Sequence, residues 1–430
     1  MKMKKFQLLL TSLLMLSAAC SCSSDDGLGK EPDVPFVKSD AHPVELTAAT
    51  RSMAADLKPT YIKFTTDVVK ASLAENSKAP HVVVSPLSAT MLFGLLANGV
   101  DDGSRDIITD YFGMDDLATF NQLCSSLLTG LPEADNLVSM NIGNSVWVNK
   151  YLNHSLTPDY LYTIEGDYQG GVFSYDFVND FTSAKKAIDR WCRERSGGIL
   201  PTLNQPLWST SPFLMLNAVY FKAPWDDEIF MGENTAKGVF HGTVRDEMVD
   251  MMKSHYISSH YYKDDDFDYF KLWFGNRAYS MTIVMPSKDM SVANAADMLT
   301  YDNMEKFRQE AVDCKLRVTM PKFKVETNMD VLSLLAGVGL GKLNEGVQLT
   351  MFGEEPERYS PLIHQSASFS VDEDGAVVAS QTSGEFLNTA VIIPGGEYEV
   401  SLDRPFFFFI TERSTDACVL SGCITNLQCD

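Results

Sequence analysis

The sequence predicts an exported α+β domain with one long, polar segment near its C-terminus. The 430 residues are 45% hydrophobic, which is enough for a large core, and no internal segment has the composition of a linker. Helical apolar periodicity is mixed with short runs of β-branched and aromatic residues. Residues 375–384 fit neither pattern, because they contain no large hydrophobe, no charge and no helical period. Long loops of this kind within a domain are uncommon, and they are usually functional or disordered.

The N-terminus has the layout of a secretion signal. Three lysines within the first five residues precede a short apolar region at 6–16, which is followed by small residues and Cys20. Small residues before a cysteine resemble the bacterial lipoprotein signal, in which that cysteine is lipidated; Cys22 is the alternative. We therefore expect a signal peptide at 1–19, a flexible tether at 20–45 and a folded domain at 46–430. The lipid would anchor the exported protein to the bacterial outer membrane or cell surface, on the outer or the periplasmic face.

Composition also limits the partners and the chemistry. The net charge of −22 argues against nucleic acid and anionic membranes as partners, so we expect membrane contact only through the lipid. The six remaining cysteines have no metal-ligand spacing, and we expect buried free thiols, with a disulfide as the alternative. Ser183 and Lys186 share the spacing of a penicillin-binding nucleophile, but its companion motifs are missing. We predict no enzyme, no catalytic residue, no cofactor and no metal site.

Local patterns predict the order of several elements. Apolar residues recur at helical spacing from 46 to 73. Residues 82–84 indicate a buried strand, after which Ser85 caps a helix that begins at Pro86 and ends at Gly99. Further helices are expected at 102–113 and at 181–198, the latter capped by Thr182 or Ser183. Strands are expected at 141–150, in the first half of 214–230, and at 279–286.

Several of these segments resemble the serpins, a family of serine-protease inhibitors. The motifs appear in the family's order over about 380 residues: HVVVSPLSATMLFGLLANG at 81–99, LMLNAVYFKAPWDDEIF at 214–230, and VDEDG with LDRPFFFFI within 371–410. The resemblance implies the serpin fold, with three β-sheets, about eight to nine helices and an exposed reactive-centre loop at about 373–396. We also expect a monomer.

The resemblance assigns roles to two groups of residues. The hinge, where the loop begins, would comprise Glu373, Gly375, Ala376, Val377, Val378, Ala379 and Ser380. The shutter and breach, which control opening of the main sheet, would comprise Ser85, Ser88, Asn217, His364 and Trp225. Helix capping explains the two serines equally well, and packing at a sheet edge explains the tryptophan. The histidine stands eleven residues before the hinge glycine, where the family usually has ten.

The resemblance also locates the bond that a target protease would attack. In the family this bond usually lies fourteen residues beyond the hinge glycine, which here is Thr389–Ala390. Alternative reactive positions are Asn388, Val391 and Ile392, and counting back from Pro405 leads to a position near 393 or 394. No lysine or arginine lies between 375 and 403. We therefore expect serine proteases that prefer small or aliphatic residues, elastase-like or subtilisin-like, to be trapped when the cut loop inserts into the main sheet. A non-inhibitory serpin, acting as a binding protein or a protease substrate, is the alternative.

Overall fold

The computed structural model describes residues 40–75, 81–198, 211–353, 358–361, 363–376 and 395–427. The predicted α+β class is confirmed, since the described residues form three sheets and nine α-helices of five residues or more. The helices are α1 (Ala48–Asp56), α2 (Lys58–Glu75), α3 (Pro86–Ala97), α4 (Asp102–Phe112), α5 (Leu117–Gly130), α6 (Pro158–Tyr162), α7 (Phe181–Arg195), α8 (Val292–Met298), α9 (Tyr301–Glu310) and the single turn α10 (Val331–Leu334). None of them is long and apolar enough to cross a membrane.

Six strands form the main sheet, in which the candidate site lies. Their order is β11 (Phe323–Asp330), β14 (His364–Asp372), β15 (Gly375–Ala376), β4 (Phe213–Pro224), β2 (Ser139–Asn149) and β3 (Gly171–Tyr175). Neighbouring strands are antiparallel except for the parallel pair β2 and β3. In the described part of the chain, the short strand β15 is the only strand that links β14 to β4.

A ten-stranded sheet contains much of the core. Its order is β1 (His81–Val84), β18 (Cys418–Ile424), β17 (Phe406–Glu412), β9 (Tyr279–Pro286), β8 (Phe267–Phe274), β7 (Ile257–Lys263), β10 (Val312–Pro321), β6 (Asp246–Lys253) and β5 (Ala236–His241), with β16 (Glu397–Ser401) on β10. The phenylalanine run 406–409 of β17 is fully buried, because elements cover both faces of these central strands. A third sheet pairs β12 (Val347–Gln348) with β13 (Arg358–Tyr359).

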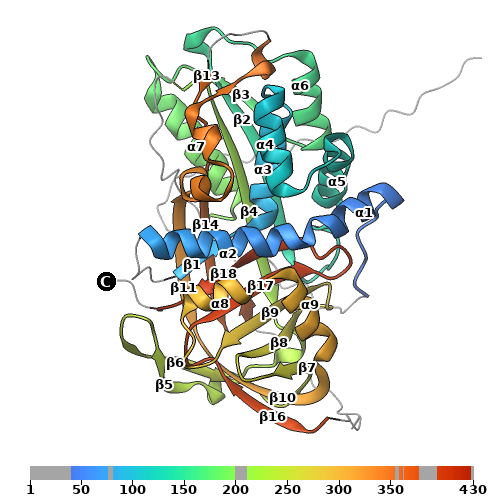
Figure 1. Ribbon diagram of the computed structural model, residues 1–430, viewed down its shortest axis with the longest axis vertical. Coiled ribbons are helices and arrows are strands. Elements are labelled where there is room, and N and C mark those ends of the chain that lie inside the picture. Colours follow the sequence, from blue (N-terminus) through green and yellow to red (C-terminus); the bar gives the residue numbers. More distant parts are fainter. Residues whose placement is uncertain are drawn as a thin grey trace, which may run out of the picture. The chain divides into compact units, whose positions relative to one another are not determined.

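Helices cover both sheets. α2 lies across β1 and β18, with α8 and α9 beside it (Figure 1). α3 packs between β18 and β4, and its residues are buried all round. The apolar pattern predicted as helical from 46 to 73 forms α1 and α2, which meet at the fully buried Leu57.

Helix α7 packs across β2 and β4 of the main sheet. Its apolar face, with Ile188 and Trp191, joins Trp147 of β2 and Leu216 of β4 in a separate hydrophobic cluster. The predicted cap of this helix was wrong: Asp180, rather than Thr182 or Ser183, is the N-cap, and its carboxylate accepts the backbone N–H of Ser183 at 3.3 Å. Carboxylates and hydroxyls serve equally well as N-caps, and three candidates stand within four residues.

Candidate functional site

The hinge residues that the structure describes lie between β14 and β4. After Asp372 the chain turns back, and Gly375–Ala376 forms β15, which pairs with β14 (Ala376 opposite Val371) on one side. On its other side, Ala376 pairs with Ala223 of β4, and its side chain is only 1% exposed. The start of the predicted loop therefore already forms part of the main sheet.

Gly375 is required by the backbone at this position. Its φ of +132° is a conformation that side-chain-bearing residues rarely adopt. A Cβ atom there would lie 2.1 Å from the carbonyl oxygen of Ala223. The close approach of β4 to the hinge therefore excludes any other amino acid without a backbone shift.

Glu373, in the turn between β14 and β15, is held by two side chains from outside that turn. Lys322, which follows β10, lies 2.5 Å from its carboxylate, and Thr235 donates a hydrogen bond at 2.6 Å. Partial burial acts to raise the pKa of Glu373, but these two hydrogen bonds outweigh it and hold the pKa below its usual value. The same contact raises the pKa of Lys322. The turn that begins the loop is thus fastened to neighbouring segments by a charged hydrogen bond.

Trp225 closes the end of β4 next to that turn. Its indole Nε1 donates to the carbonyl oxygen of Asp372 at 2.9 Å, and its ring stacks on Phe274 with centroids 4.6 Å apart. Its backbone N–H also faces the carbonyl oxygen of Asp374, at 3.4 Å. The tryptophan therefore both packs the end of the sheet and contacts the hinge turn, in the place where the resemblance puts the breach.

The predicted shutter residues Ser85, Ser88 and Asn217 come together beneath the main sheet. The side chain of Ser85 accepts the backbone N–H of Ser88 and so caps α3, as expected from the Ser-Pro pair. The hydroxyl of Ser88 donates to the side-chain oxygen of Asn217 on β4. Ser85 therefore caps the helix, and Ser88 contacts the main sheet.

Two further polar residues extend this cluster, and sequence reasoning had missed both. Gln365 of β14 accepts the backbone N–H of Ser85 and donates to its carbonyl oxygen, each at 2.9 Å. Asn217 donates to Asn144 of β2 at 2.7 Å, and Asn144 donates to the carbonyl oxygen of Tyr168 at 2.9 Å. We call Gln365, Ser85, Ser88, Asn217 and Asn144 the polar chain; it connects β14, α3, β4 and β2.

The position of Gln365 bears on the predicted role of His364. His364 begins β14 and stands opposite Asp330 of β11, and its side chain lies outside the described residues. Gln365 stands ten residues before Gly375, the spacing that the family usually has for its histidine. At the spacing that the family usually has for its histidine, this chain therefore has Gln365. The Gln365 side chain reaches Ser85, the N-cap of α3.

A small cavity of about 20 Å³ lies between the two strands flanking the hinge. Its lining includes Val219 and Phe221 of β4, Phe369 of β14 and Leu420 of β18. It is large enough for about one water molecule. Beyond β15, side chains of β4 and β14 therefore line the space between the two strands, and no described residues pair these strands directly.

Several predicted residues lie outside the described part of the chain. They are Cys20, the hinge residues Val377, Val378, Ala379 and Ser380, the reactive bond Thr389–Ala390, and the alternatives Asn388, Val391 and Ile392. Within the described ranges, Cys124, Cys192, Cys314, Cys418 and Cys423 are buried free thiols. No group of three or more histidine, cysteine or acidic side chains in these ranges is arranged to hold a metal ion.

Fold and site together define a protein whose main sheet includes, as the short strand β15, the hinge residues at the start of the predicted loop. The family model described as Serpin (serine protease inhibitor) matches residues 60–427. The chain therefore belongs to the serpin family.

Individual relatives are distant but cover most of the chain. Iripin-1 of Ixodes ricinus is 25% identical over 358 residues, which cover 81% of this chain and 89% of that protein. Leukocyte elastase inhibitor of Homo sapiens is 24% identical over 373 residues, which cover 84% of this chain and 96% of that protein.

Two solved structures share the fold. The thermophilic serpin tengpin in its native state has a TM-score of 0.76 at 21% identity, covering 90% of this chain and 98% of that chain. Thyroxine-binding globulin in complex with thyroxine has a TM-score of 0.74 at 18% identity, covering 88% and 100%.

Proposed function

We propose that this protein is a suicide inhibitor of serine proteases, which traps the acyl-enzyme by inserting its cut loop into the main sheet. The observation that carries the proposal is β15. The hinge residues Gly375 and Ala376 are already paired between β14 and β4, so the strand that would grow during insertion has its starting point and its register.

The protease supplies the chemistry of the first half of the reaction. Its serine oxygen attacks the carbonyl carbon of Thr389, the bond to the nitrogen of Ala390 breaks, and that nitrogen leaves as a free amine with a proton from the protease histidine. Thr389 then remains as an ester on the protease serine. Water would hydrolyse this ester in an ordinary substrate, so inhibition requires insertion to be faster than hydrolysis.

The loop sequence suits a strand inside the sheet. Side chains alternate between the two faces of a strand, so every second residue after the buried Ala376 would share its face. The residues at these positions are all uncharged: Val378, Ser380, Thr382 and Gly384. A strand of about 15 residues, at about 1 kcal/mol net for each hydrogen bond, offers on the order of 10 kcal/mol. This gain is comparable to the whole stability of an ordinary domain, so the uncut protein would be held in its fold kinetically.

The reactive segment also suggests the target class. Thr389 and the residues after it are small or aliphatic and would fit a shallow apolar specificity pocket, as in elastase-like or subtilisin-like proteases. The name of the human relative, leukocyte elastase inhibitor, agrees with this preference. The absence of lysine and arginine between 375 and 403 argues against trypsin-like targets.

The direct test is to mix the protein with pancreatic elastase at equal molarity and separate the products on a denaturing gel. We expect a stable band at the summed mass, and N-terminal sequencing of the released C-terminal peptide should begin at Ala390. The variant Thr389→Arg should gain a covalent band with trypsin that the parent protein lacks. Complete cleavage by every elastase-like and subtilisin-like protease tried, with no covalent band, would instead favour a non-inhibitory serpin that acts as a substrate or a binding protein.

We further propose that the chain is exported and anchored by a lipid at Cys20. The support is the N-terminal pattern alone: a signal peptide at 1–19, a tether at 20–45 and the serpin domain at 46–430. Expression in a bacterium fed labelled palmitate should label the parent protein and the control Cys22→Ser, but not Cys20→Ser. Labelling of Cys20→Ser would contradict the assignment.

A further inference from the structure

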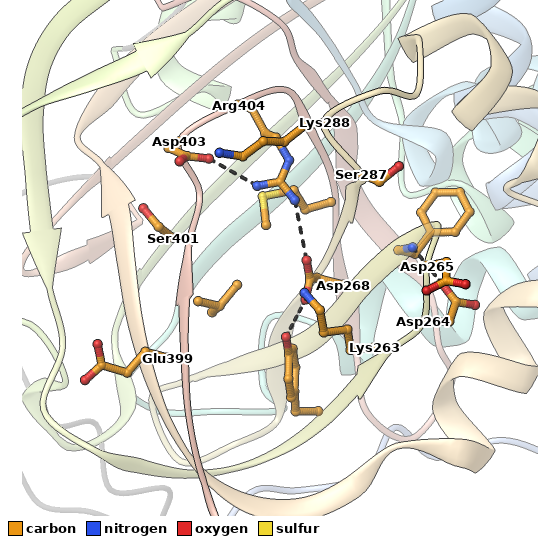
Figure 2. Close-up of a pocket in the computed structure, with 14 residues that line it drawn as sticks. Lys263, Asp264, Asp265, Asp268, Ser287, Lys288, Glu399, Ser401, Asp403 and Arg404 are labelled. Atoms are coloured by element: carbon orange, nitrogen blue, oxygen red, sulfur yellow. Dashed lines mark hydrogen bonds and ion pairs between the residues drawn. The ribbon is translucent and has the colours of Figure 1, made fainter.

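The larger cleft of the structure, beside β16, has no unmet chemistry. Figure 2 shows its charged groups next to one another: Asp268 lies 3.0 Å from Lys263 and 3.5 Å from Arg404, and Arg404 is also paired with Asp403 at 3.1 Å. Its apolar lining residues are at most 6% exposed. The space between β14 and β4 is different, because the side chains on both of its walls have places in a defined ladder.

The pairing of β15 with its two neighbours fixes where each later residue of an inserted loop would lie. Ala376 stands opposite Val371 of β14 and Ala223 of β4, and both pairs of strands are antiparallel. In an antiparallel ladder, one step forward along one strand is one step back along its partner. Each loop residue therefore has two defined partners, and only a bulge would shift them.

The small cavity between β4 and β14 lies at the first positions of this extended ladder. Val378 would stand opposite Phe369 on one side and Phe221 on the other, and both phenylalanines line the cavity. Val219, another lining residue, would stand opposite Ser380. The wall that Val378 would meet is therefore apolar, as that side chain is.

The same ladder places Thr382 at the polar chain. Thr382 itself lies outside the described residues, but its partners would be Gln365 of β14 and Asn217 of β4. Directly opposite residues of neighbouring antiparallel strands share a face, with Cβ atoms about 4.5–5.5 Å apart. Thr382 would therefore stand between the two amide side chains, which now contact α3 separately.

Both amides have hydrogen-bonding capacity for a further partner. Gln365 accepts one bond and donates one, both with Ser85, and Asn217 accepts one from Ser88 and donates one to Asn144. An amide nitrogen has two hydrogens and an amide oxygen has two lone pairs. Among the bonds recorded for the described residues, one N–H of Gln365 and one lone pair of Asn217 are therefore unused. A threonine hydroxyl can accept the first and donate to the second.

The neighbouring positions on the same face of the loop lack this match. Ser380 also carries a hydroxyl, but its partners would be Ala367 and Val219, whose side chains offer no polar group. Gly384 has no side chain. Within this face of the loop, Thr382 is thus the hydroxyl whose two expected partners are both polar.

Insertion also creates a need for such a contact. A strand requires about 4.7–4.9 Å to each neighbour, so β14 and β4 must move apart beside the polar chain. Helix α3 cannot then keep all its contacts with both strands, and a buried amide that loses its partner destabilises the inserted sheet. A new partner on the incoming strand would remove this penalty.

We propose that Thr382 is a positioning residue for loop insertion, whose hydroxyl bridges Gln365 and Asn217 in the inserted sheet. The inference rests on the proposed inhibitory function and adds to it the loop residue that recognises the polar chain.

The test compares Thr382→Val, which keeps the shape and removes the hydroxyl, with Thr382→Ser, which keeps the hydroxyl. Ser380→Ala is the matched control, because it removes a hydroxyl from the same face. We expect Thr382→Val to need about three to ten times more equivalents to inhibit pancreatic elastase, since one hydrogen bond is lost during insertion. After the loop is cut, this variant should also unfold at a lower guanidinium concentration than the cut parent protein. The other two variants should match the parent protein in both measurements, and all four uncut proteins should unfold alike.

Three results would overturn the inference while leaving the proposed inhibition intact, as shown by a covalent band with the parent protein. The first is parent-like behaviour of Thr382→Val in both measurements. The second is a larger loss in Ser380→Ala, which would mean that the ladder is displaced by two residues. The third is a Thr382→Ser variant that behaves like Thr382→Val, which would assign the effect to the methyl group. A parent protein that neither forms the band nor gains stability when cut would instead overturn the proposed function and this inference together.

Discussion

Replacing Ala376 by arginine tests whether the hinge must enter the sheet for inhibition. The Ala376 side chain is 1% exposed, between Val371 of β14 and Ala223 of β4. A guanidinium at this position would be buried without a partner, which costs several kcal/mol. If only about 2 kcal/mol of this cost falls on the barrier to insertion, insertion slows about 30-fold. Hydrolysis of the acyl-enzyme, which the variant leaves unchanged, would then be faster than trapping.

The assay is a titration of elastase activity with inhibitor, together with the denaturing gel. We expect the parent protein to need about one equivalent, and Ala376→Arg to need many equivalents and to be cleaved with little covalent band. Ala236→Arg, on the exposed edge strand β5, makes the same chemical change where no burial is lost and should behave like the parent protein. If Ala376→Arg inhibits with the parent stoichiometry, insertion of this residue is not part of the mechanism.

Three further variants test the contacts around the hinge and in the polar chain. Glu373→Gln should lower the unfolding free energy by about 1–2 kcal/mol at pH 7, because the charged hydrogen bond to Lys322 is lost. The pKa of Glu373 is lower in the folded protein than its unfolded value of 4.5. The stabilisation by its carboxylate is therefore present above pH 4.5 and is lost as the pH falls through the folded-state pKa. In urea titrations from pH 7 to 3, the unfolding free energies of the parent protein and Glu373→Gln should therefore converge. Gly375→Ala should lower the unfolding free energy by about 1–3 kcal/mol through backbone strain, again measured by urea titration. It should also raise the number of inhibitor equivalents needed to inhibit elastase. An unchanged unfolding free energy and an unchanged stoichiometry would contradict the close approach of β4 to Gly375. Asn217→Ala should lower the unfolding free energy by about 1–3 kcal/mol, because it leaves its buried partners Ser88 and Asn144 unsatisfied. The control Asn234→Ala, at an exposed position, should be neutral. Equal unfolding midpoints for Asn217→Ala and the parent protein would show that the polar chain adds no stability.

Local signals in the sequence were sufficient for elements whose ends depend on neighbouring residues. The strand β1 and helix α3 follow the prediction because the serine cap and the proline at the first helical position act within four residues. Gly113, in the left-handed conformation, ends α4 where expected. The same reasoning failed for α7, where Asp180 took the cap, since propensity alone does not rank neighbouring candidates.

The polar chain could be predicted only in part, because it joins residues that are distant in the sequence. Gln365 reaches Ser85 across 280 positions, and nothing in its own surroundings marks it as different from other polar residues of a strand. Asn144 meets Asn217 only because β2 and β4 pair in the register that places them opposite each other. Ser85, Ser88 and Asn217 were found because they lie in motifs that resemble a known family.

The strength of these contacts is consistent with a sheet that can open. Between β14 and β4, the described connections include the two residues of β15, the hydrogen bond from Trp225 to Asp372, and the polar chain. In the polar chain, Gln365 makes two hydrogen bonds to Ser85, and Ser88 makes one to Asn217. At about 1 kcal/mol net for each bond, breaking the polar chain costs about 3 kcal/mol, well below the roughly 10 kcal/mol that a full inserted strand would return. If the loop inserts as proposed, opening would therefore be limited by a barrier rather than by the free-energy difference between the closed and the inserted sheet. While the sheet opens, these polar groups would be buried without hydrogen-bond partners, at a cost of about 1–3 kcal/mol each. This cost would supply part of the barrier. Under the proposed mechanism, the polar chain would hold the sheet closed, and the backbone hydrogen bonds of the inserted strand would more than offset its loss.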